Sequence, residues 1–114
     1  MTEIIPNSPS GRQLADTGIA LAQDHADAEI VAWSDRIMSA FESWLMLQDS
    51  AFAVEDFRAH IEARHPALVP PSPNAWGAVG RMAVNRGLVR FIGYRPARSA
   101  ATRNHPVRVF RRAA

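Results

Sequence analysis

The stretch from residue 73 to residue 95, PNAWGAVGRMAVNRGLVRFIGYR, changes its pattern halfway and constrains the fold more than any other. Its first half has apolar residues at helical spacing, and Ser72 before Pro73 is a typical helix start. Gly87 is the residue type that most often ends a helix. Residues 88–94, LVRFIGY, follow directly and have the composition of a strand. A helix that leads at once into a strand predicts an α+β fold.

A second strand is predicted at residues 106–112, PVRVFRR, where Val107 and Val109 alternate with Arg108 and Phe110. This alternation has the period of two that places successive side chains on opposite faces of a strand. The intervening segment RPARSAATRNH is basic and has turn-forming residues. We therefore expect a β-hairpin with a long basic loop.

Two helices are expected in the N-terminal half, and a third follows them. The first covers residues 14–26. The second covers residues 29–47, EIVAWSDRIMSAFESWLML, whose apolar residues recur at steps of three and four. Its aromatic stripe fits either the core of the domain or a homodimer seam. Residues 51–54 suit a brief extended segment, residues 55–64 resume helical spacing, and a Pro-rich linker follows.

The chain length of 114 residues predicts one compact domain, which we place at residues 13–114 after a flexible tail of residues 1–12. No run of apolar residues is long enough to predict a membrane span. The absence of Cys excludes a disulfide framework and thiolate metal sites. These features lead us to expect a cytoplasmic protein.

Charge is divided unevenly along the chain. All eleven acidic residues lie between Glu3 and Glu62, so residues 1–65, with four Arg, carry a net charge of −7. Residues 66–114 carry nine Arg and no acid, a net charge of +9. Such an asymmetry indicates a polyanionic partner for the basic half, and Arg suits both phosphate and the guanine edge. A solvated basic face without a partner is the other interpretation.

The order of predicted elements resembles the winged helix-turn-helix family. The resemblance rests on AFAVEDFRAHIEAR and SPNAWGAVGRMAVNRG as a helix pair and on LVRFIGY and PVRVFRR as the two wing strands. More narrowly, the chain looks like small winged-helix proteins encoded by phages and prophages. The Pro-rich linker is longer than a tight helix-turn-helix allows, and Ala53 stands where a Ser or Thr cap is expected. The implied architecture has two N-terminal helices, a helix pair and a C-terminal β-hairpin wing.

This resemblance implies binding to double-stranded DNA, sequence-specific or semi-specific, as a transcriptional regulator or replication-associated protein in a bacterial host cell. The second helix of the pair would read bases in the major groove, while the wing arginines would contact phosphates or the minor groove. The predicted DNA-binding residues are Asn74, Arg81, Asn85, Arg86, Arg90, Arg95, Arg98, Arg103 and Arg108.

Another class of function is a protein-binding module. Winged helices also bind proteins, and the acidic N-terminal helices suit docking on a basic host or phage protein complex that the module inhibits or recruits. Enzyme activity is not expected: His60 and His65 are spaced five apart, which does not place two metal ligands on one helix face, and GAVGRM lacks the Lys of a phosphate loop. We expect no cofactor and no metal.

Overall fold

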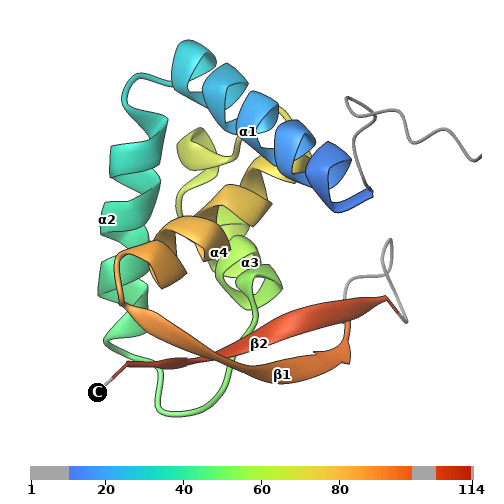
Figure 1. Ribbon diagram of the computed structural model, residues 1–114. Coiled ribbons are helices and arrows are strands. Elements are labelled where there is room, and N and C mark those ends of the chain that lie inside the picture. The colour runs from blue at the N-terminus through green and yellow to red at the C-terminus, as the bar shows by residue number, and fades with distance from the viewer. Residues whose placement is uncertain (1–10, 99–104, 114) are drawn as a thin grey trace, which may run out of the picture.

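A computed structural model describes residues 11–98 and 105–113 of the chain, and this part has an α+β fold. It contains four α-helices and a two-stranded antiparallel sheet (Figure 1). The helices are α1 (Gly11–Glu29), α2 (Trp33–Leu45), α3 (Val54–Arg64) and α4 (Trp76–Asn85), and the strands are β1 (Val89–Pro96) and β2 (Pro106–Arg112). In Figure 1, α4 lies in the middle of the molecule, with α1 on one side and the hairpin on the other.

Helix α2 supplies the centre of the hydrophobic core. Trp33, Ile37 and Phe41 are almost completely buried, and the Trp33 indole N–H donates a 2.9 Å hydrogen bond to the Leu68 carbonyl. Phe41 meets Phe57 of α3 edge-on at 5.1 Å between ring centroids. The aromatic stripe therefore packs inside the domain, which is the first of its two interpretations.

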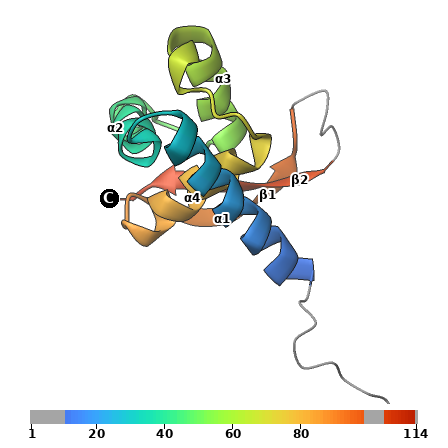
Figure 2. The same cartoon turned by 90° about the horizontal axis from the view of Figure 1, so that it is seen from above.

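The first two helices are separated by a short break. The sequence predicts a helix from residue 29, but α2 begins only at Trp33, after Ala32 adopts a left-handed conformation with φ of 53°. This break lets α1 turn away from α2 and lie across α4 (Figures 1 and 2). Helical spacing in the sequence continues through the break, which explains why the pattern does not reveal it.

The extended segment predicted at residues 51–54 is reduced to one bridge. Phe52 pairs with Phe110 through backbone hydrogen bonds of 3.0 and 2.8 Å, which fixes the start of α3 beside β2. Ala53 provides no side-chain cap for α3, but the Asp56 carboxylate accepts a 2.9 Å hydrogen bond from the Ala53 amide. Half of a capping box thus remains despite the missing Ser or Thr.

The fourth helix starts differently from its prediction but ends at the predicted glycine. Ser72 and Pro73 begin a 3₁₀ turn, Pro73–Ala75, that leads into α4, and the Ser72 side chain makes no capping hydrogen bond. Gly87 has φ of 70°, and the Leu88 amide bonds back to the Ala83 carbonyl, so the glycine ends the helix as the sequence predicts. The linker is not wholly extended, since it contains a second 3₁₀ turn, Pro66–Leu68.

The two predicted strands form the hairpin. Val89 is opposite Arg112, Phe91 is opposite Phe110, and the register shifts at a bulge between Phe91 and Gly93. Phe110 packs into the core beside α4, because its ring lies 3.8 Å from the position that a Cβ on Gly80 would occupy. The sheet is thus held against the helices through Phe110 of β2 and Val89 of β1, both of which are in the core.

The described part of the chain begins with a helix. Helix α1 begins at Gly11, so residues 11 and 12 belong to a helix instead of the predicted flexible tail. Residues 1–10 lie outside the described part, as do residues 99–104 of the predicted basic loop. Within the described ranges, no helix has the length and apolar character needed to cross a membrane.

Candidate nucleic-acid interface

The loop end of the hairpin carries two of the predicted DNA-binding arginines, and both are paired with acids. An Nη of Arg95 lies 3.0 Å from a carboxylate oxygen of Glu55 and 2.9 Å from one of Asp56. An Nη of Arg98 lies 3.3 Å from Asp56, and the Arg98 backbone amide donates 3.0 Å hydrogen bonds to Glu55. We call these four residues the ionic clamp, because they fasten the hairpin to the first turn of α3.

The ionic clamp is shielded from solvent around Arg95. The side chains of Arg95, Glu55 and Asp56 are 19%, 16% and 24% exposed, whereas that of Arg98 is 71% exposed. Burial lowers the pKa of Arg95, but hydrogen bonds and charges from Glu55 and Asp56 outweigh that effect and raise the pKa above its usual value. Arg95 therefore has a structural partner for its charge and is poorly placed to contact a phosphate.

The predicted recognition helix is covered by α1. Arg81 of α4 forms a 2.7 Å ion pair with Asp16 of α1. A Cβ placed on Gly77 would lie only 2.8 Å from the Ile19 side chain, so the two helices approach closely at this glycine. Figure 2 shows α1 crossing above α4. The face of α4 that a major groove would receive is thus partly occupied by the chain itself.

The expectation of nine unopposed arginines is therefore wrong for three of them. Arg81, Arg95 and Arg98 all pair with acids from the N-terminal half of the chain. Sequence position separated the charges of the two halves, but folding brings α1 and the start of α3 against the basic half. Arg103 lies outside the described residues.

The start of the hairpin is different, because its arginines have no acidic partner among the described residues. Arg90 and Arg111 are directly opposite each other in the register, and both are exposed. Directly opposed residues of an antiparallel pair have their side chains on the same face, where like charges repel. Arg86, just after α4, is also exposed and makes no ion pair with a described residue. We call Arg86, Arg90 and Arg111 the open arginines.

The remaining predicted residues lie apart from the open arginines. Arg108 is exposed and has no acidic partner among the described residues. It lies three residues before Arg111 on β2, and successive side chains of a strand point to opposite faces, so Arg108 projects from the opposite face of the sheet to Arg111. Asn85 is exposed at the end of α4. Asn74 is exposed in the 3₁₀ turn before α4, with Gly18 of α1 beside its amide. The nine predicted residues thus do not form one continuous surface.

A groove of about 810 Å³ lies between α1, α4 and β2. Its lining residues carry charges of both signs, from Asp16, Glu55, Arg81 and Arg108. Mixed charge makes this groove a poor channel for a uniformly negative backbone. The groove therefore adds nothing to the predicted phosphate-binding surface.

Sequence reasoning missed a group of exposed apolar side chains on β1. Phe91, Ile92 and Tyr94 are 47%, 45% and 63% exposed, and the rings of Phe91 and Tyr94 meet edge-on at 5.2 Å. Tyr94 is directly opposite Arg108. The signal was present, because LVRFIGY has too many large apolar residues for a strand that buries only one face.

The described residues contain no group of three or more His, Cys, Asp or Glu side chains that could hold a metal ion. Comparisons of the chain with protein-family models, with curated proteins and with solved structures found no match. The open arginines, the ionic clamp and the covered face of α4 are thus the observations on which a function must rest.

Proposed function

We propose that the protein is a winged-helix protein that binds double-stranded DNA semi-specifically, mainly through phosphate contacts from its hairpin. The order of α2, the Phe52 bridge, α3, α4, β1 and β2 supports the winged-helix assignment. In this arrangement α3 and α4 are the helix pair, and the β1–β2 hairpin is the wing.

The observation that carries the proposal is the opposed pair Arg90 and Arg111. Two like charges directly across an antiparallel pair destabilise a sheet unless an anion lies between or over them. A DNA phosphate supplies such an anion, and the guanidinium groups bind phosphate through paired hydrogen bonds. Arg86, close in sequence to the start of β1, adds a third positive charge.

Base reading has a smaller part in this proposal than in the sequence-based expectation. Asn85 and Arg86 are exposed at the C-terminal end of α4, whereas Arg81 is held by Asp16. Phosphate contacts position a protein without selecting a sequence, so weak sequence preference follows. The cellular role that fits is that of a phage-type transcriptional regulator or replication-associated protein in the bacterial cytoplasm.

The experiment is a salt titration of binding to a mixed-sequence duplex, with Arg90→Ala/Arg111→Ala as the test variant. Each lost phosphate contact lowers the slope of log affinity against log salt by about 0.9, so the double variant is expected to lose nearly 2 from the slope. Arg58→Ala/Arg64→Ala on α3 is the control, because it removes the same charge elsewhere. Equal slopes for the test and control variants would refute the hairpin contact.

A second candidate is the protein-binding module, favoured by the covered face of α4. With α1 across α4, the exposed surface of α1 and α2 includes Asp24, Glu29, Asp35 and Glu42, and this acidic surface suits a basic protein partner. It predicts that Asp35→Asn/Glu42→Gln abolishes function in the host while duplex binding persists. If both double variants lose function, the protein uses both surfaces.

A further inference from the structure

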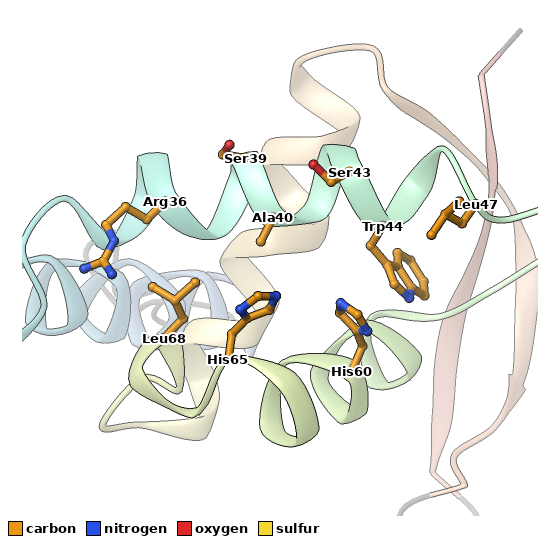
Figure 3. A pocket seen from close by; sticks show the side chains of 9 residues that line it. All are labelled: Arg36, Ser39, Ala40, Ser43, Trp44, Leu47, His60, His65 and Leu68. Carbon is orange, nitrogen blue, oxygen red and sulfur yellow. The ribbon is translucent and has the colours of Figure 1, made fainter.

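A second groove lies on the side of the molecule formed by α2 and α3, and it is lined by two histidines. It has a volume of about 560 Å³ and opens to solvent between α2 and the end of α3 (Figure 3). His60 of α3 and His65, just after α3, both extend across it toward α2, with Arg36 at one end and Trp44 and Leu47 at the other.

The two imidazoles contact each other but have no hydrogen-bond partner among the described residues. Their ring centroids lie 5.8 Å apart at an interplanar angle of 66°. Neither ring makes a hydrogen bond with a residue that the structure describes, although His60 is half-buried and stacks 6.4 Å from Phe57. At this separation the two rings contact each other edge-on, so a small polar ligand can reach their free nitrogens only from the open groove.

The charges around the groove decide the sign of that ligand. Arg36 lines the groove, and Arg64 is close enough to affect His60, whereas none of the described Asp and Glu residues lines it. The neighbouring acid Glu62 is engaged by Arg58 at 3.4 Å. A divalent metal ion at two histidines would meet these positive charges without a carboxylate to offset them, so an anion is favoured over a cation.

The titration behaviour of His60 agrees with this environment. Burial lowers the pKa of His60 most, and the nearby charges of His65 and Arg64 lower it further. A positive field that disfavours the charged imidazole would be compensated by a bound anion. Anion binding and protonation of the histidines therefore assist each other.

The geometry points to a binding site for a phosphate-type oxyanion in this groove, bound by the ring nitrogens of His60 and His65, with Arg36 at the groove's end adding positive charge. The shared chemistry is a tetrahedral dianion, from either a free ion or a phosphomonoester. Trp44 and Leu47, at the other end of the groove from Arg36, form an apolar surface that receives the organic part of a monoester. This site is independent of the hairpin and of the proposed DNA binding.

The test follows the four histidine ring signals by NMR while sulfate is added at constant ionic strength. Sulfate is chosen because its charge is constant over the range used, from about pH 5.5 to about pH 8, in which histidine titrates. Signals of His60 and His65 are expected to move along a saturable curve, with sulfate binding at least about tenfold tighter at the lower pH, because binding linked to the uptake of one proton strengthens by up to about tenfold per pH unit. His25 on α1 and His105 on the hairpin are internal controls, both exposed and outside the groove.

Variants distinguish a specific anion-binding site from general effects of charge. Arg36→Gln and His65→Gln are each expected to weaken sulfate binding severalfold, while Arg58→Gln, on the same pair of helices but outside the groove, leaves it unchanged. Both glutamines replace exposed side chains, so folding is retained and can be checked by circular dichroism. Equal movement of all four histidines, or no saturation, would overturn the site.

Two further titrations, with phenyl phosphate and with zinc chloride, identify the class of ligand. Phenyl phosphate that binds more tightly than sulfate and perturbs the Trp44 indole signal supports a monoester; equal affinity supports a free ion. Zinc chloride is the opposing probe. Saturable zinc binding that displaces sulfate, with tighter binding at high pH, would overturn the oxyanion assignment in favour of a metal.

Discussion

The two ends of the hairpin have the same charged residue in contrasting surroundings. At the loop end, Arg95 and Arg98 are bound by Glu55 and Asp56 of α3. At the opposite end, Arg90 is opposite Arg111, and neither has an acidic partner among the described residues. The contrast teaches that an arginine in an acid-free stretch of sequence has no fixed role, because the acids that neutralise it come from a distant segment. One end fastens the hairpin to α3, and the arginines at the other end are unpaired among the described residues.

The largest effect is expected from breaking the ionic clamp. Asp56→Ala leaves the shielded Arg95 with one carboxylate in place of two and removes the acceptor for the Ala53 amide. Removing one partner of a largely buried charge pair costs about 3 kcal/mol, so the free energy of unfolding should fall by about that amount. Urea denaturation measures it.

Glu62→Ala is the matched control for this prediction. Its pair with Arg58 has side chains 39% and 46% exposed, so the loss should stay below about 0.5 kcal/mol. Similar losses for the two variants would show that the clamp contributes no more than an exposed ion pair and would erase the difference between the hairpin's ends.

The next effect distinguishes the two ends by DNA affinity. Arg90→Glu should weaken duplex binding by about tenfold or more, because it removes the phosphate contact that we propose for Arg90 and adds repulsion. Arg98→Glu makes the same charge change at the clamped end and should weaken binding by less than about threefold, through the long-range field alone. Fluorescence anisotropy on a labelled duplex measures both. A larger loss for Arg98→Glu would reverse the assignment of the two ends.

A smaller effect is expected where α1 covers α4. Asp16→Asn frees Arg81 from a pair whose side chains are 38% and 52% exposed, so stability should change by less than about 0.5 kcal/mol. If α4 contributes to DNA binding once uncovered, affinity should rise modestly and sequence preference should appear in selection from random duplexes. Unchanged affinity and preference would confine binding to the hairpin.

The smallest effect concerns pH and the groove far from the hairpin. Because the pKa of His60 is lowered from 6.5 in the folded chain, the unfolded chain binds more protons just below that value. Stability should therefore fall slightly as pH decreases through this range, and His60→Gln should flatten the dependence. Thermal unfolding at several pH values measures it; a steeper fall in the variant would contradict the depressed pKa.

Much of the local structure could be predicted from the sequence. The strand at residues 106–112 has its predicted bounds, Gly87 ends α4 with a positive φ, and the helix at residues 54–64 begins within one residue of its expected start. These features depend on interactions between near neighbours, such as alternation and the left-handed preference of glycine. The break at residues 30–32 was not predictable, because Ala32 is not a residue type associated with positive φ.

The candidate site was less predictable than the fold. Charge segregation correctly singled out the C-terminal half as basic, and Arg90 remains unpaired among the described residues. The pairing of Arg81 with Asp16 and of Arg95 with Asp56 joins residues 65 and 39 positions apart. No periodicity or motif signals such contacts, because they arise from the way the helices stack.

The amino-acid sequence alone determined the α+β class, the helix that leads into a strand, and the excess of arginine near the C-terminus. Backbone preferences and side-chain periodicity act over a few residues, so they can be recognised in the sequence without knowledge of the fold. Only the tertiary structure decided which arginines are neutralised and which face of helix α4 is covered by α1. It also decided that His60 and His65 share a groove with Arg36. Coulomb interactions and burial depend on distance in space, and that distance is set by packing.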